Sequence, residues 1–227
     1  IEITMKNFGD PIWEKIFNKR EWGKYPYEEV IKFYMLASKK YDHSPNVLDI
    51  GAGIGAHSWF MTKEGGNVTA LEGSNSALKK IKKIQKEFNV LNEIEVVKGN
   101  ITMPLKILKK KYDILLDNLS LCVNDEDQIE NAFKEYYAIM NSKGHFLTIS
   151  LGEKSTGYKT GSKLSTRTWK NISSGAMKDR GMITWYNAKY LKKLFTKIGF
   201  SITSYSNILQ NINGIIVEKN IFHLQKN

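Results

Sequence analysis

The stretch VLDIGAGIGAHSWF, residues 47–60, decides the fold of this chain. An apolar run containing one acid leads into Gly51, Gly53 and Gly55, and a helical pattern begins directly after them. A strand that enters a helix through so tight a turn aims backbone N–H groups and the positive end of the helix dipole at one point. Glycine is needed where φ is positive or where a ligand touches the backbone. We therefore expect the turn at 51–55 to hold the negative or electron-rich part of a ligand.

The spacing of the glycines, taken alone, leaves several interpretations open. A phosphate-binding loop would end in Gly-Lys-Ser/Thr, whereas Ala56 and His57 stand at that place. A nicotinamide-binding fingerprint would read G-x-G-x-x-G, whereas residues 51–55 read G-x-G-x-G. An ordinary strand–helix turn that holds no ligand also fits. The choice therefore depends on the rest of the chain.

Short apolar runs alternate with longer amphipathic patterns along the sequence. The runs that predict buried strands are 46–50, 68–72, 94–99, 112–117, 145–150, 200–205 and 214–224. Helical stripes lie at 78–88, 129–140 and 188–198, and a further helix is expected after a turn at 23–26. Strands separated by helices predict a mainly parallel sheet covered on both faces. The last two strands have no helix between them and predict an antiparallel hairpin at one edge.

Polar residues follow three of the predicted strands. Glu72 ends the second strand, Gly99 and Asn100 follow the third, and Asp117 and Asn118 close the fourth. Open α/β sheets bind ligands at the carboxyl ends of their strands, where a carboxylate can accept both ribose hydroxyls of an adenosine. Each residue alone also suits an ordinary turn, because Asx residues favour turns. Together they favour an adenosine-containing ligand.

With these residues in place, the sequence resembles the class I S-adenosylmethionine-dependent methyltransferases. The matching segments are VLDIGAGIG, the acid of ALEGS, GN after the third strand, YDILLDNLS, GHFLTIS and YNAKYLKKLFTKIGFSI. The resemblance implies a Rossmann-like three-layer α/β sandwich with a seven-stranded sheet of order 3-2-1-4-5-7-6 and an antiparallel seventh strand. It also implies S-adenosyl-L-methionine as the cofactor and S-adenosyl-L-homocysteine as its product.

The resemblance implies cofactor contacts for residues at the strand ends and in the turns after them. These residues are Asp49, Gly51, Ala52, Gly53, Gly55, Glu72, Gly73, Ser74, Asn100, Ile101, Asp117 and Asn118. Asp49 would orient the glycine turn, Glu72 would hold the ribose, and Asn100 would meet adenine where many relatives carry Asp. The segment WGKYP, residues 22–26, is similar to a subgroup that acts on small metabolites or sugar intermediates. That similarity adds Tyr25, with Lys24, as a contact of the cofactor carboxylate.

Methyl transfer from a sulfonium is an in-line displacement, so the protein mainly aligns the acceptor and excludes water. A general base helps when the acceptor is a hydroxyl. His57, on the first helical turn after the glycines, and Asp117 are the candidate catalytic residues. The alternatives are that His57 packs or caps the helix and that Asp117 only binds the cofactor.

The stretch 152–182 is rich in Gly, Ser, Thr and Lys and predicts a substrate lid loop. Five residues in or beside it are candidates for the acceptor pocket: Tyr158, Arg167, Trp169, Arg180 and Trp185. The two arginines suit an anionic group. The alternative is that these side chains only anchor the loop by packing.

Composition sets the remaining expectations. The 227 residues suit a single methyltransferase domain, with 1–40 as an N-terminal segment over the cofactor. The net charge of +11 is nearly all lysine, which we interpret as genome composition or an anionic small substrate, with nucleic acid a weaker partner class. The lone Cys122 excludes an internal disulfide, and no apolar run is long enough to span a membrane. We expect a cytoplasmic monomer or homodimer with no metal site.

The sequence therefore predicts a methyltransferase acting on an O or N atom of a small, anionic metabolite or a sugar or polysaccharide precursor. An RNA or protein methyltransferase is the alternative, although DNLS stands where base-amino methylation needs an (N/D)-P-P-(Y/F) segment. An NAD(P)-dependent oxidoreductase is less favoured, because the glycine spacing differs from its fingerprint. The identity of the acceptor, the choice of O or N and the oligomeric state do not follow from the sequence.

Overall fold

The structure is a computed structural model that describes residues 11–90 and 93–227. The first ten residues of the predicted N-terminal segment therefore lie outside the described residues. The helices are α1 (Ile12–Lys19), α2 (Glu28–Ser38), α3 (Ala56–Lys63), α4 (Asn75–Glu87), α5 (Glu126–Ile139) and α6 (Ala188–Ile198), with short 3-10 turns at Pro104–Lys106 and Leu121–Val123. The strands of the main sheet are β1 (Asn46–Ile50), β2 (Asn67–Glu72), β3 (Ile94–Lys98), β4 (Tyr112–Asn118), β5 (Met140–Leu151), β9 (Phe200–Ile212) and β10 (Ile215–Lys226).

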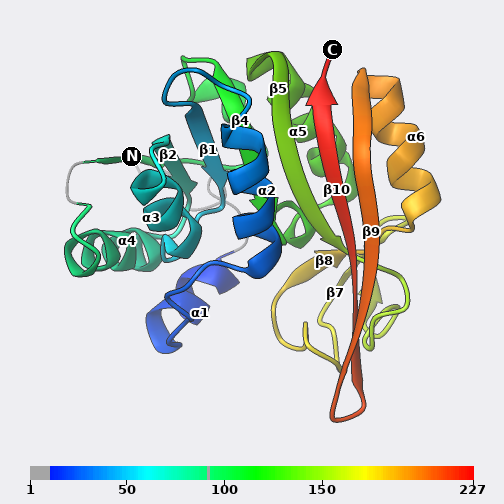
Figure 1. Ribbon diagram of the computed structural model, residues 1–227. Helices are drawn as coiled ribbons and strands as arrows, with labels where there is room; N and C mark the ends of the chain where they lie inside the picture. Colours follow the sequence, from blue (N-terminus) through cyan, green and yellow to red (C-terminus); the bar gives the residue numbers. More distant parts are fainter. Residues whose placement is uncertain (1–10, 91–92) are drawn as a thin grey trace.

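The main sheet has seven strands in the order β3-β2-β1-β4-β5-β10-β9. The first five strands are mutually parallel, and β10 runs antiparallel to both β5 and β9 (Figure 1). Counted within this sheet, the strands follow the predicted order 3-2-1-4-5-7-6 with the seventh strand antiparallel. The labels differ because three further strands form a separate small sheet.

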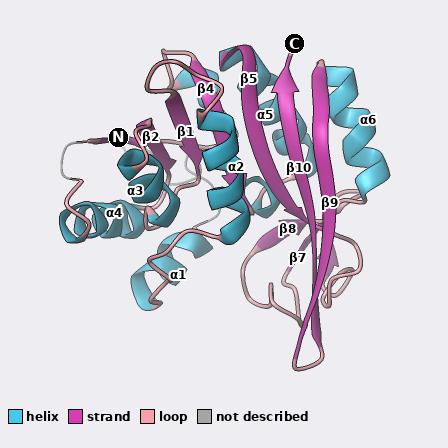
Figure 2. Cartoon of the chain, in the orientation of Figure 1, coloured by secondary structure: helices cyan, strands magenta, loops and turns pink. Residues whose placement is uncertain are grey.

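Helices cover both faces of the sheet (Figure 2). One face packs against α2, α3 and α4, and the other against α5 and α6. Consecutive residues of a strand point to opposite faces of the sheet. In β4, Leu115 belongs to the core under α5 and α6, and Leu116 belongs to the core under α2. A strand buried on both faces must be apolar throughout, which explains the near-continuous apolar runs that predicted β1 and β4.

The predicted lid loop contains regular structure. Residues 152–184 form an insertion with three short antiparallel strands, β6 (Ser162–Lys163), β7 (Thr168–Lys170) and β8 (Met182–Thr184). The insertion has its own buried cluster, which includes Trp169, Ile172 and Met177. The sequence did not predict these short strands, because the apolar residues are too sparse and irregularly spaced to show a period. They meet only when the chain folds back on itself.

The insertion and α1 lie along the same edge of the main sheet, at the carboxyl ends of the parallel strands (Figure 1). Parallel α/β sheets bind their ligands at this edge. The topology therefore brings two segments from opposite ends of the chain to the place where the glycine turn lies.

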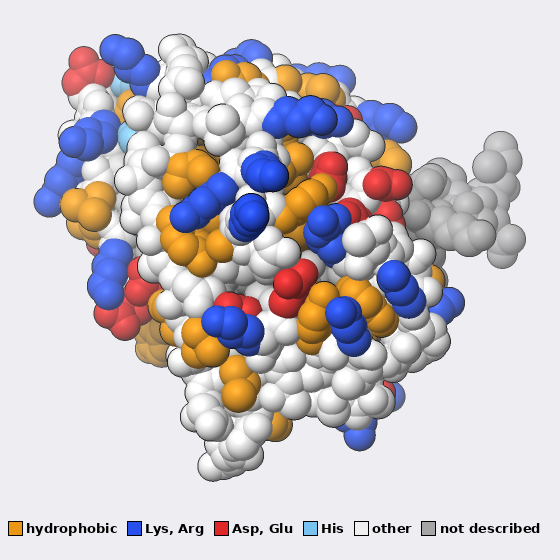
Figure 3. All heavy atoms as spheres, turned by 90° about the vertical axis from the view of Figure 1, so that its right-hand side faces the viewer, with side chains coloured by type: hydrophobic (Ala, Val, Ile, Leu, Met, Phe, Trp, Pro, Cys, Tyr) orange, Lys and Arg blue, Asp and Glu red, His pale blue; other side chains and the backbone are white. Residues whose placement is uncertain are grey.

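Positive charge is spread over the surface on the side of α6 and β9. Figure 3 shows lysine and arginine side chains there, interspersed with acidic and apolar ones. None of the helices that the structure describes is long and apolar enough to cross a membrane.

Candidate active site

The glycine turn takes a backbone conformation that few other residues adopt. The φ angles of Gly51, Gly53 and Gly55 are +66°, +56° and +87°. The Gly51 N–H donates to the Leu71 carbonyl over 2.8 Å, which ties the turn to β2. A Cβ atom on Gly51 would lie 2.5 Å from the Cβ of Ser120. The predicted need for glycine is therefore confirmed for both conformation and space.

The Glu72 carboxylate joins the end of β2 to the glycine turn. It accepts the backbone N–H of Gly53 and the backbone N–H of Ser74, each over 2.8 Å. The side chain is buried, and burial raises the pKa of Glu72. A carboxylate offers about four acceptor positions, so acceptor positions remain on Glu72 for a ligand.

Three buried carboxylates, those of Asp49, Glu72 and Asp117, end β1, β2 and β4. Burial, opposed by a hydrogen bond from Ser58 and reinforced by the charges of Glu72 and Asp117, raises the pKa of Asp49 to about 7. Burial also raises the pKa of Asp117 to about 6. In the described part of the chain, none of the three forms an ion pair with Lys or Arg. The site therefore favours a ligand that carries positive charge.

Asp117 holds the turn that follows β4. Its Oδ1 accepts the backbone N–H groups of Ser120 and Leu121, both over 3.0 Å, and its Oδ2 accepts the Thr148 hydroxyl over 2.8 Å. Most acceptor positions of this carboxylate are thus engaged within the protein. These bonds support a positioning role in the cofactor site more strongly than a role as general base.

His57 lies beside Asn118 at the start of α3. The two side chains meet with 3.3 Å between the Asn118 Nδ2 and the His57 Nε2. An amide nitrogen only donates, so Nε2 accepts and Nδ1 carries the proton. Burial lowers the pKa of His57 to about 4. The imidazole is therefore neutral at physiological pH.

We expect the imidazole resonances of His57 to stay unchanged between pH 8 and 5.5 and to titrate with a midpoint near the pKa of about 4. The reason is that burial disfavours the charged form. NMR titration measures this, and His57→Gln identifies the signal. His43 serves as the internal control, because the hydrogen bonds that its ring donates to Asp42 and then to Asp113 raise its pKa. A His57 midpoint above that of His43 would contradict the neutral assignment.

The end of β3 presents Asn100 in a fixed orientation. Its Oδ1 accepts both the backbone N–H and the hydroxyl of Thr102, each over 2.9 Å. The side-chain acceptor is thus used locally, and the amide nitrogen is the group left for a ligand. Next to it, the carbonyl of Ile101 is held by the Tyr136 hydroxyl over 2.6 Å. An Asn in this place therefore offers adenine a donor.

Helix α1 covers the glycine turn, which the sequence reasoning did not resolve. Glu14 accepts the hydroxyls of Ser74 and Ser76 over 2.7 and 2.6 Å, at the start of α4. Phe17 is buried against Ile54, and its ring would lie 3.4 Å from a Cβ on Gly53. The apolar spacing within IWEKIFNK, residues 12–19, was the available signal.

Tyr25 lies apart from the strand ends. Its side chain is 73% exposed, and the edge-on neighbours of its ring are Trp59 and Phe88. Lys24 pairs with Glu87 over 2.6 Å. The structure therefore does not bring this pair together with the other predicted cofactor residues.

Four of the five predicted acceptor residues have other partners. Trp169 and Trp185 are buried in the insertion, with Tyr158 packed edge-on against both rings. Arg167 pairs with Glu126, and its Cζ lies 3.5 Å from the centroid of the Tyr190 ring. Arg167 thus links the insertion to α5 and α6, and the three aromatic rings pack in the buried cluster of the insertion, which fits the packing alternative.

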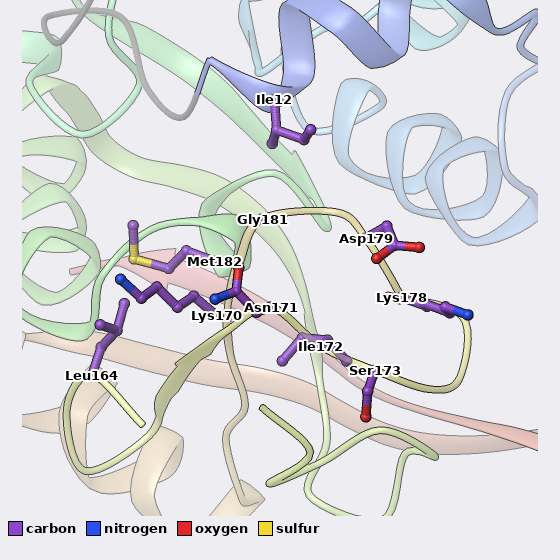
Figure 4. A pocket seen from close by; sticks show the side chains of 10 residues that line it. All are labelled: Ile12, Leu164, Lys170, Asn171, Ile172, Ser173, Lys178, Asp179, Gly181 and Met182. Carbon is purple, nitrogen blue, oxygen red and sulfur yellow. The ribbon is translucent and has the colours of Figure 1, made fainter. Parts of the chain in front are cut away.

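A cavity of about 650 Å³ opens between α1 and the insertion (Figure 4). Its apolar lining residues include Ile12, Leu164 and Met182, and its charged ones are Lys170, Lys178 and Asp179. A cavity of this size takes a small molecule, and the two lysines outnumber the one acid, which favours an anionic ligand. Over the residues that the structure describes, no group of three or more His, Cys, Asp or Glu side chains could hold a metal ion.

The fold is a Rossmann-like α/β sandwich, and the glycine turn and the buried carboxylates lie at the carboxyl ends of its parallel strands, where such sheets bind ligands. Residues 47–144 match the sequence model of a family described as "Methyltransferase domain". The matched segment is less than half of the chain, contains the glycine turn and β1 to β4, and resembles the class I S-adenosylmethionine-dependent methyltransferases, whose cofactor is S-adenosyl-L-methionine.

Several known proteins are similar to this chain in sequence or in fold. Over 100 residues it is 30% identical to phosphoethanolamine N-methyltransferase 1 of Triticum aestivum, a segment that is 44% of this chain and 20% of that protein. A methyltransferase structure from Methanosarcina mazei has a TM-score of 0.69 at 15% identity, covering 89% of this chain and 98% of that one. The Burkholderia thailandensis 1,6-didemethyltoxoflavin-N1-methyltransferase, with bound 1,6-didemethyltoxoflavin and S-adenosylhomocysteine, has a TM-score of 0.62 at 15% identity, covering 88% and 78%. At these identities the two structures show a shared fold.

The residues present fit this cofactor. Asp49, Glu72 and Asp117 are buried acids without a cationic partner in the described residues, and the cofactor carries an ammonium and a sulfonium. The turn at Gly51 and Gly53 has no side chains that would block close approach. Glu72 has acceptor positions left for the ribose, and both hydrogen bonds from Thr102 to the Asn100 side chain go to its oxygen, so the amide nitrogen can donate to adenine.

Proposed function

We propose that this protein transfers a methyl group from S-adenosylmethionine to an O or N atom of a small, anionic metabolite or sugar precursor. One observation carries the cofactor part: the glycine turn is surrounded by three buried carboxylates with no cationic partner among the described residues. The lysine-rimmed cavity at Ile12 supports a small anionic acceptor. The names of the wheat and Burkholderia enzymes, which refer to small molecules, support the same acceptor class.

When bound, the cofactor supplies a methyl group on a positively charged sulfur. The chain then contributes alignment, which supplies roughly 7–11 kcal/mol in well-oriented reactions. Asp49 accepts the Ser58 hydroxyl in α3, Glu72 accepts the Gly53 N–H within the glycine turn, and α1 covers the site and excludes water. His57 is neutral and can accept a proton from a hydroxyl only after exchanging its bond with Asn118.

The first test compares ligands by thermal melting. We expect S-adenosylhomocysteine at ~100-fold saturation to stabilise the protein by near 2.7 kcal/mol, and NADH to leave it unchanged. The same protein is then incubated with methyl-labelled cofactor and three acceptor pools, namely small anionic metabolites, RNA and protein. Label in the small-molecule pool alone supports the proposal. Stabilisation by NADH alone, or label only in RNA or protein, would contradict it.

A further inference from the structure

Two of the three arginines in the chain lie against one tryptophan. The Cζ of Arg20 lies 5.5 Å from the centroid of the Trp22 ring, and the Cζ of Arg180 lies 5.9 Å from it. Arg20 directly follows α1, whereas Arg180 belongs to the insertion. The ring is therefore a meeting point of two segments that are far apart in sequence.

These two charges have no counter-ion within the described residues. Neither guanidinium forms an ion pair there. The acids next to the two arginines in sequence lie elsewhere: the carboxylate of Glu21 lies 3.8 Å from the Lys80 Nζ, and Asp179 lines the cavity. Burial, and then the charge of Arg20, lower the pKa of Arg180. Two like charges held close together repel each other, and a bound anion would remove the repulsion.

Unused donors stand beside the guanidinium groups. The indole nitrogens of Trp13 and Trp22 are buried and have no hydrogen-bond partner among residues 11–90 and 93–227, and the centroids of the two rings are 6.5 Å apart. A buried indole N–H normally finds an acceptor, so two unpaired ones require a reason. Arginine and tryptophan side chains are donors without acceptor atoms. The set therefore has the composition of an oxyanion site.

The position of Trp13 connects this set to the active site. Trp13 packs against the buried cluster of the insertion and also against the cluster of Phe17 and Ile54 that covers the glycine turn. An anion bound at Trp22 would thus lie between the insertion and α1. The cavity lined by Ile12 and Asp179 opens between the same two elements (Figure 4).

We propose that Arg20 and Arg180, together with the indole N–H of Trp22, bind the phosphate or carboxylate group of the methyl acceptor. This inference rests on the proposed function, because it assigns the acceptor half of the same site. Guanidinium groups match the planar, bidentate geometry of such oxyanions better than lysine does. The anion also links the insertion to the segment after α1 and would close the site over the acceptor.

Inorganic phosphate is the probe for the first arm of the test. Its binding is followed by calorimetry and by tryptophan emission in the full chain. We expect Arg20→Gln and Arg180→Gln each to weaken phosphate binding by ~10-fold or more, and Trp22→Phe to abolish most of the emission change. Arg180→Lys keeps the charge but loses the planar, bidentate guanidinium, so its phosphate affinity should lie between those of wild type and Arg180→Gln. Lys163→Gln removes one charge from the exposed part of the insertion and should change binding by less than about 2-fold.

The second arm measures S-adenosylhomocysteine affinity in the same proteins and separates the sources of the anion. We expect Arg20→Gln and Arg180→Gln to keep this affinity within about 2-fold, which also shows that they are folded. An equal loss of S-adenosylhomocysteine affinity would mean that the arginines hold the cofactor, and it would overturn the inference. Equal phosphate binding in all variants would overturn it too. Failure of the wild type to bind S-adenosylhomocysteine would instead overturn the proposed function.

Discussion

Replacing Glu72 with alanine should lower the affinity for S-adenosylhomocysteine by ~100-fold or more, because two hydrogen bonds to a charged group are worth about 1.5–3 kcal/mol each. In this structure the same carboxylate also pairs the backbone N–H groups of Gly53 and Ser74. Its loss leaves both donors unpaired at about 1–3 kcal/mol each. A domain with a typical stability of about 5–15 kcal/mol stays folded under that cost. Calorimetric titration and a melting curve measure the two effects separately.

Glu95→Ala is the matched control on the neighbouring strand. Its carboxylate accepts the Thr69 hydroxyl over 2.8 Å and pairs with Lys110 over 2.7 Å, and both contacts are away from the strand ends. It should change the ligand affinity by less than about 2-fold. Glu72→Gln keeps the volume and one acceptor and should lie between Glu72→Ala and wild type. A Glu72→Ala protein that binds S-adenosylhomocysteine normally would show that the cofactor site is elsewhere.

The second large effect is expected for Gly51→Ala. Two terms act against this substitution. A residue with a Cβ costs about 1–2 kcal/mol in the left-handed conformation, which the φ of +66° requires. The added Cβ would also lie 2.5 Å from the Cβ of Ser120, and overpacking of this kind costs typically about 1–3 kcal/mol. Urea unfolding should show the sum, and S-adenosylhomocysteine binding should be lost because the turn is displaced.

Gly65→Ala separates the two terms. Gly65 has a φ of +87°, but a Cβ there would meet no atom within 4 Å. This control should show only the conformational cost of about 1–2 kcal/mol and unchanged ligand affinity. Gly53→Ala is intermediate, since its nearest neighbour is the movable ring of Phe17 at 3.4 Å. Equal losses of stability and binding in Gly51→Ala and Gly65→Ala would contradict the close contact with Ser120.

Much of the main sheet could be predicted because its signals are local. The run 46–50 was predicted as a strand and is β1, and the stripe at 188–198 is α6 with the same bounds. The side chain of Ser74 caps α4 by accepting the Ala77 N–H over 3.1 Å. Apolar periodicity and helix capping depend on residues close together in the chain, so both can be recognised from the sequence alone.

The candidate site was only partly predictable. The residues after β1, β2, β3 and β4 could be named because the carboxyl ends of parallel strands share one edge. Their hydrogen-bond partners could not be predicted. The oxygen of the Asn100 side chain is already bonded within the protein, and the Asp117 carboxylate accepts three hydrogen bonds. The same holds for Arg167, whose pairing with Glu126 depends on the placement of the insertion against α5.

The sequence by itself determined which segments form the strands and helices of a mainly parallel sheet and the edge at which a ligand binds, because apolar runs alternate with helical patterns and polar residues follow the strands. The order of the strands was implied by the family resemblance. Only the tertiary structure decided what covers that edge. Glu14 reaches the start of α4, and Arg20 meets Arg180 at Trp22, because packing brings together segments that carry no mutual sequence signal. Such long-range contacts are set by the folded backbone as a whole, so the acceptor side of the site becomes visible only in three dimensions.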